Sequence, residues 1–115
     1  GFLCGCHSPH NLLFQTNTVY FLPCLKFPYL FYIQFPHAKK SISLGASFNN
    51  WKTNQIILKP SSNDVWYINL PMLPGGRHQY KFFIDNSYWA EDVSNPWRIF
   101  DNHGGWNNVV ELSEN

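Results

Sequence analysis

The sequence predicts an all-β fold, a sandwich or barrel of about seven short strands. From about Leu30 onward, short runs of apolar or alternating residues recur along the chain. Gly, Pro, Asn and Asp separate these runs at the spacing typical of all-β domains. No segment keeps a convincing helical period over a dozen residues, so an α-helical fold is not expected.

The first four expected strands are each bounded by turn residues. "LFYIQF" (30–35) ends at "PHAKK", and "SISLGA" (41–46) runs into "SFNNWKTN". "QIILK" (55–59) and "VWYINL" (65–70) lie on either side of "PSSND". All four runs are rich in the β-branched and aromatic residues that favour strands.

The last three expected strands are "HQYKFFID" (78–85), "SYWAED" (87–92) and "NNVVEL" (107–112). Side chains of a strand alternate between its two faces. His78, Tyr80, Phe82 and Ile84 therefore form the expected core face of the first of these strands. Lys81 is expected on the opposite face, in the middle of the strand.

Residues 1–29 differ from the rest of the chain. They hold one charged residue, Lys26, and many apolar residues without clear periodicity. We expect an irregular apolar leader outside a domain formed by residues 30–115. Its most apolar stretch is interrupted by Lys26 and two prolines and is shorter than the roughly 20 residues of a spanning helix, so no membrane span is expected. The three cysteines all lie in the first 24 residues, and an odd number argues against a closed disulfide framework.

The composition limits the classes of partner. Only 13% of residues are charged and the net charge is +1, whereas 18% are aromatic. Binding to nucleic acid or to an anionic membrane surface is therefore not expected, because both need a basic patch. Stacking on single-stranded nucleic acid would likewise need a basic groove.

Two tryptophans and a lysine suggest a sugar-binding surface. Trp51 follows the asparagines of an expected turn, "SFNNW", and Trp89 follows another turn, "DNS". An exposed indole can cover the apolar C–H face of a sugar ring at little entropic cost. Amine and amide groups such as those of Lys81 and Asn107 can bond the hydroxyl rim. The alternative to sugar binding is a purely structural role: each tryptophan packs in the core, the lysine is solvated and the asparagines form turns.

Catalysis is not expected. Glycosidases need two carboxylates facing one bond, whereas Glu91 and Asp92 are adjacent and should point apart. Asp85 and Asp101 lie in turns without an evident partner. We find no nucleophile–base set, no phosphate-binding or dinucleotide glycine motif, and no metal-ligand spacing, so no cofactor or metal is expected.

Several blocks resemble a known family. "SISLGASFNNW", "GGRHQYKFFIDNSYWAED" and "GGWNNVVEL" are similar, in the same order, to the glycogen-binding module of AMP-activated protein kinase beta subunits, in carbohydrate-binding module family 48. The resemblance implies an immunoglobulin-like, early-set β-sandwich that binds α-1,4-linked glucan, glycogen or starch, without catalysis. It also implies an intracellular location, cytoplasmic or, in a starch-storing organism, plastidial. The implied sugar contacts are Trp51, Lys81, Trp89 and Asn107, with Asn50, Asn102 and Trp106 as further candidates.

The chain departs from the family at two positions, and alternative functions remain open. The family places an apolar residue where this chain reads "DNHGG", and Trp106 replaces a smaller residue. The kinase subunit continues into a segment that binds its partner subunits, so this chain by itself is not expected to scaffold a kinase. The alternatives are a regulatory or protein-interaction module of the same fold that has lost sugar binding, and the N-terminal fragment of a glucan-acting enzyme or of a kinase regulatory subunit.

Overall fold

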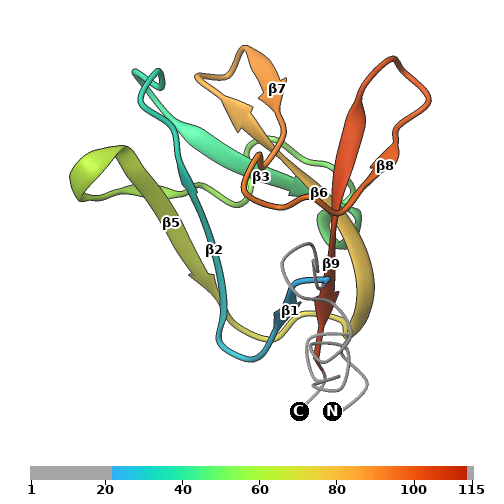
Figure 1. Cartoon of the computed structure of the whole chain (residues 1–115). Helices are drawn as coiled ribbons and strands as arrows, with labels where there is room; N and C mark the ends of the chain where they lie inside the picture. Colours follow the sequence, from blue (N-terminus) through green and yellow to red (C-terminus); the bar gives the residue numbers. More distant parts are fainter. Residues whose placement is uncertain (1–21, 114–115) are drawn as a thin grey trace, which may run out of the picture.

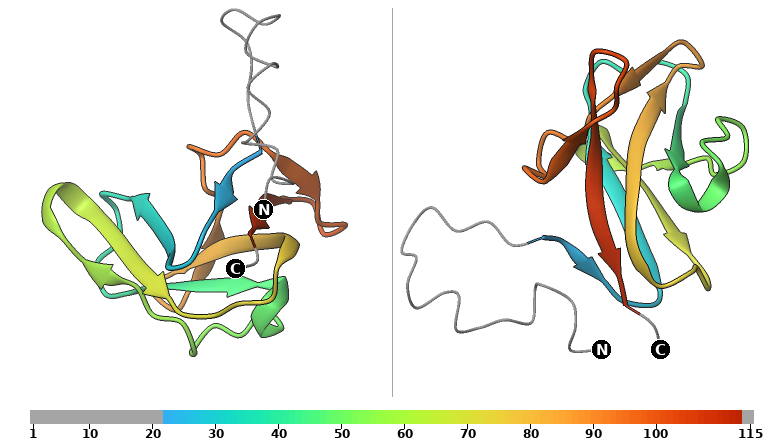
Figure 2. Two further views of the ribbon diagram at one scale, coloured as in Figure 1. Left: turned by 90° about the horizontal axis from the view of Figure 1, so that it is seen from below. Right: turned by 90° about the vertical axis from the view of Figure 1, so that its right-hand side faces the viewer.

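A computed structural model describes residues 22–113 of the chain as two facing β-sheets (Figure 1). Nine strands and two short 3-10 turns occur in this range, so the predicted all-β, immunoglobulin-like sandwich is confirmed. Hairpins β6–β7 and β8–β9 project from the same end of the sandwich (Figures 1 and 2). This end carries the site described below.

The larger sheet has the order β1-β9-β6-β3, with β7 also beside β6 and β8 beside β9. Its strands are β1 (Cys24–Leu25), β3 (Ile42–Ala46), β6 (Gly76–Ile84), β7 (Tyr88–Ala90), β8 (Arg98–Phe100) and β9 (Trp106–Leu112). The smaller sheet has the order β2-β5-β4. Its strands are β2 (Tyr29–Gln34), β4 (Lys59–Pro60) and β5 (Val65–Leu70), and the 3-10 turns are η2 (Ser47–Asn49) and η3 (Ser62–Asp64).

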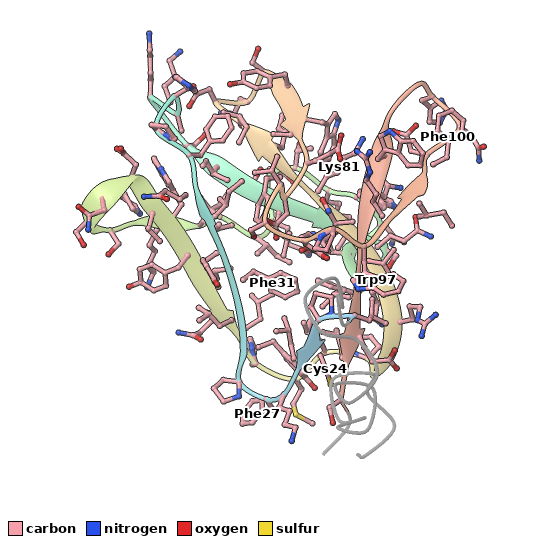
Figure 3. All side chains as sticks on the ribbon, in the orientation of Figure 1. Cys24, Phe27, Phe31, Lys81, Trp97 and Phe100 are labelled. Carbon is pink, nitrogen blue, oxygen red and sulfur yellow. The ribbon has the colours of Figure 1, made fainter. Side chains whose placement is uncertain are left out.

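The core lies between the sheets and follows the period of two. Tyr80, Phe82 and Ile84 of β6 are 4%, 0% and 0% exposed, which confirms the predicted core face of this strand. Phe31 of β2 meets Tyr80 edge to face, with ring centroids 5.4 Å apart, and Figure 3 shows Phe31 between the two sheets. Lys81 therefore lies on the outer face of the larger sheet.

Three segments differ from the predicted strands. β1 and β8 are two and three residues long and pair only with β9, so neither had enough length to give a periodic signal. The segment predicted at 55–59 forms only an isolated bridge, Ser43 to Ile57, before the short strand β4. It still lies along β3, because the N–H of Leu44 donates to the carbonyl of Ile56 at 2.8 Å.

Most of the predicted leader, residues 1–21, lies outside the described residues. Its remainder contacts the sandwich: β1 pairs with β9 in parallel, and the Tyr29 hydroxyl donates to the Ser113 carbonyl at 2.7 Å. Cys24 in β1 is disulfide-bonded. Whether residues 30–115 fold without these contacts remains a prediction. Within residues 22–113, no helix has the length and apolar character needed to cross a membrane.

Candidate functional site

A cleft of about 440 Å³ opens on the outer face of the larger sheet, at the end that carries the two hairpins. The side chains that line it come from β6, β7, β9 and the turns that follow β3 and β8. They are Trp51, Lys81, Trp89, Asp101, His103 and Asn107. The structure thus brings together all four residues that the sequence and the resemblance assigned as principal sugar contacts.

Trp51 reaches the cleft through an unusual turn. The side chain of Asn49 is buried, and its Oδ1 accepts the N–H of Ala46 at 2.9 Å, which closes the 3-10 turn. Asn50 and Trp51 follow with positive φ values of 57° and 60°. Such values are rare for a bulky residue and mark a constrained backbone. The asparagines therefore turn the chain, and the indole that follows them lines the cleft.

Trp89 lies directly on the backbone of β3. It pairs with Phe83 across β6 and β7, and their ring centroids are 4.8 Å apart. A Cβ placed on Gly45 would come within 2.7 Å of two atoms of the Trp89 ring. A side chain at position 45 would thus collide with the ring, so Gly45 permits this close approach.

The two indoles meet at a steep angle. Their ring centroids are 6.1 Å apart and their planes are inclined by 78°. Trp89 is 40% exposed, so its side chain is neither buried in the core nor fully exposed to solvent. The pair forms a corner of two apolar surfaces.

Lys81 is paired rather than free. Its Nζ lies 2.8 Å from Oδ2 of Asp101, and the two side chains are only 13% and 12% exposed. The other carboxylate oxygen of Asp101 accepts the N–H groups of His103 at 2.7 Å and Gly105 at 2.9 Å. The bond from Lys81, helped by these two N–H groups, holds the pKa of the Asp101 carboxyl well below its usual range. This carboxylate therefore stays ionised and fixes the lysine between the β6–β7 and β8–β9 hairpins (Figure 3).

The neighbouring asparagines of β9 have different roles. Asn108 is 0% exposed, and its Oδ1 accepts the N–H of Asp92 at 2.7 Å. Asn107 points to the outer face, where its Nδ2 donates to Oε1 of Gln79 at 3.0 Å. Only the first asparagine of the pair can therefore contact a ligand in the cleft.

The matches to known proteins cover about two thirds or more of this chain. The family model for the glycogen recognition site of AMP-activated protein kinase matches residues 29–115. The chain belongs to this family. It is 35% identical over 82 residues to 5'-AMP-activated protein kinase subunit beta-2 of Mus musculus, and equally so to that of Homo sapiens, a match that covers 71% of this chain and 28% of each subunit. Subunit beta-1 of Bos taurus is 37% identical over 75 residues, covering 65% of this chain and 26% of the subunit. The matched part of this glycogen-recognition module thus spans little more than a quarter of its relatives.

The three further candidates of the sequence analysis are not among the six residues that line the cleft. Asn50 is exposed at the end of η2, and Asn102 is exposed in the β8–β9 turn with a φ of 67°. Trp106 is two residues from the buried Asn108 and so shares its face, opposite to Asn107. Its ring packs against Phe100 at 5.5 Å, and the guanidinium of Arg98 lies over it at 4.5 Å.

Sequence reasoning missed four residues of the site: Gly45, Gln79, Asp101 and His103. A glycine inside a strand does signal close approach of another group, so Gly45 could have been found. Asp85 and Asp101 were considered only as members of a catalytic carboxylate pair, and their hydrogen-bonding roles were not predicted. Asp85 accepts the N–H groups of Lys39, Lys40 and Ser41. The partner of Asp101 lies twenty residues away in sequence, where no local pattern reveals it.

Proposed function

We propose that this glycogen-recognition module binds α-1,4-linked glucan in the cleft, through Trp51, Lys81, Trp89 and Asn107. The observation that carries the proposal is the convergence of two partly exposed indoles with an amine and an amide in one cleft. Two rings at 78° offer apolar surface to sugar units that face different directions. A curved α-1,4-glucan presents its C–H faces in this manner, whereas a flat ribbon does not.

The polar groups are already oriented for hydroxyls. Lys81 has three N–H donors and directs one of them to Asp101, so the others can reach a ligand. Asn107 donates one N–H to Gln79, which fixes the plane of its amide. Because these groups are held before the ligand arrives, little side-chain entropy is lost on binding.

The proposal is of binding without catalysis. Asp101 is the one carboxylate among the six residues that line the cleft, whereas glycoside hydrolysis uses a pair. Its low pKa also makes it a poor general acid at neutral pH. Binding of single-stranded nucleic acid is disfavoured, since Asp101 balances the charge of Lys81.

The names of the relatives suggest the wider setting. Because they are subunits of AMP-activated protein kinase, we propose that this module works inside the cell and serves to bring a kinase, or another enzyme, to glucan. The alternative is a module of the same fold that has lost sugar binding and kept an interaction role. Direct measurement of glucan binding decides between them.

The test replaces each indole of the cleft. We expect Trp51→Ala and Trp89→Ala each to weaken binding of maltoheptaose at least about tenfold, because burial of some 60–80 Å² per ring at about 25 cal/mol per Å² contributes roughly 1.5–2 kcal/mol. Tyr32→Ala, which removes an exposed ring from the smaller sheet, is the matched control and should bind normally. Isothermal titration calorimetry and a thermal melt are run on the same samples.

Each other result has a distinct meaning. Unchanged binding by both tryptophan variants with intact melts would move the sugar site elsewhere. Loss of the cooperative thermal melt would show that the replaced tryptophan stabilises the fold rather than binding sugar. No binding by the unmodified chain, to maltoheptaose or to glycogen, would favour the interaction module.

A further inference from the structure

Trp97 is a large exposed side chain that the cleft does not use. It precedes β8, at the base of the β8–β9 hairpin (Figure 3), and is 42% exposed. Its backbone is held on both sides: its N–H donates to Oδ1 of the buried Asn95 at 3.0 Å, and its carbonyl accepts the N–H of Val109 at 3.0 Å. The indole is thus mounted on a fixed backbone while nearly half of it faces solvent.

The strand register places Trp97 on the same face as the cleft. Ile99 pairs with Asn107, and paired residues of neighbouring strands share a face. Trp97 lies two residues before Ile99 and opposite Val109, which in turn pairs with Gln79 on β6. By alternation, Trp97 and Ile99 therefore face the side of the larger sheet that carries Asn107 and Gln79.

Trp97 lies close to the Asn107 side of the cleft. Val109 lies two residues along β9 from Asn107, about 7 Å away, and the neighbouring strand adds about 5 Å sideways, so the backbone of Trp97 is roughly 9 Å from that of Asn107. Ile99 is 47% exposed and lies directly beside Asn107. A ligand that leaves the cleft past Asn107 would meet Ile99 and then Trp97.

We propose that Trp97, with Ile99, forms a second aromatic subsite that extends the cleft for longer α-glucan chains. This inference rests on the proposed function. A short oligosaccharide fills the corner between Trp51 and Trp89, whereas a longer chain continues past Asn107 and places a further sugar ring on the indole of Trp97. The exposed apolar face of the indole supplies the contact, and affinity rises with chain length because both parts of one ligand are held together.

The test compares ligands of two lengths. Binding of maltotriose and of a linear maltodextrin of about twenty glucose units is measured by calorimetry for the unmodified chain and for Trp97→Ala. We expect maltotriose affinity to stay the same and affinity for the long chain to fall at least about fivefold, since burial of some 40–50 Å² of ring at about 25 cal/mol per Å² supports a change of this size. Trp97→Phe, which keeps a ring, should restore much of the loss.

Phe100→Ala is the matched control. Phe100 lies in β8, is 49% exposed, and pairs with Trp106 on the opposite face of the sheet. This variant should bind both ligands as the unmodified chain does. A thermal melt of each variant checks that the hairpin is intact.

The outcomes separate the two proposals. Equal binding of the long chain by Trp97→Ala and the unmodified chain would overturn the subsite and leave the cleft in place. Equal losses for both ligands would also overturn it, because Trp97 would then support the cleft or the fold. No binding of either ligand by the unmodified chain would overturn the proposed function and the subsite together.

Discussion

Replacing Gly45 by alanine tests how Trp89 is positioned. The added methyl group would lie 2.7 Å from Cη2 and Cζ3 of the Trp89 ring and 3.5 Å from Cε3 of Trp51. Ordinary carbon–carbon contacts need about 3.5–4.0 Å, so the Trp89 ring has to move by roughly 1 Å or leave β3 altogether. The fold around it can stay, because the ring is 40% exposed and can move toward solvent.

The magnitude follows from the contact that is displaced. If the ring leaves the corner, its share of the ligand contact is lost, about 1.5–2 kcal/mol for 60–80 Å² of apolar area. We therefore expect Gly45→Ala to weaken maltoheptaose binding by about ten- to thirtyfold. Overpacking costs about 1–3 kcal/mol, whereas alanine is favoured over glycine in a strand by about 0.5–1 kcal/mol. The net cost is therefore at most about 2.5 kcal/mol, and the melting temperature should fall by no more than roughly 20 °C.

Ser43→Ala is the matched control for this experiment. Ser43 lies two residues earlier on the same strand and the same face, and it is 2% exposed. Among the described residues, its hydroxyl is a buried group without a hydrogen-bond partner, so its removal should be neutral or slightly stabilising. Calorimetry with maltoheptaose, a thermal melt and tryptophan fluorescence are compared for the two variants. Gly45→Ala that binds like the unmodified chain, with unchanged fluorescence, would refute the idea that Gly45 positions Trp89.

Three further predictions concern the ion pair and the domain limit. Lys81→Met should weaken maltoheptaose binding about fivefold, which corresponds to the loss of one hydrogen bond, and should lower the melting temperature because Asp101 loses its cationic partner. The double variant Lys81→Met/Asp101→Asn should regain the normal melting temperature but still bind weakly. A normal melting temperature for Lys81→Met alone would contradict this coupling. Since the pKa of Asp101 is lowered in the folded chain, its contribution to stability is present above the unfolded carboxyl pKa of about 3.9 and is lost as pH falls toward the folded value. The difference in melting temperature between the unmodified chain and Asp101→Asn should therefore be largest near pH 6 and become smaller below roughly pH 4. A difference that grows in acid would contradict the lowered pKa of Asp101. Residues 30–115 should melt cooperatively but at a lower temperature than residues 22–115, because the contacts of β1 and Tyr29 are lost. If residues 22–115 melt cooperatively and residues 30–115 do not, the domain boundary at residue 30 is wrong.

Local patterns were sufficient for the sheet positions of the main residues. Alternation along β6 separates Tyr80 and Phe82 from Lys81, since a strand has only two faces and the apolar set must be buried. The turn chemistry of "FNNW" predicts where the chain reverses, because Asn tolerates left-handed dihedrals and bonds its own backbone. These properties depend on a few neighbouring residues and therefore can be read in the sequence.

Contacts between distant segments depended on the tertiary structure. Trp51 and Trp89 are 38 positions apart, and only the pairing of β3, β6 and β7 places their rings 6.1 Å from each other. Lys81 has no local signal for an acidic partner, and the β8–β9 turn supplies Asp101 from twenty residues away. The short strands β1 and β8 form because β9 offers them free backbone groups, not because of any pattern of their own. Local alternation thus separated the two faces of β6, whereas the packing of the hairpins decided which side chains meet, because that outcome depends on the register between strands that are far apart in the chain.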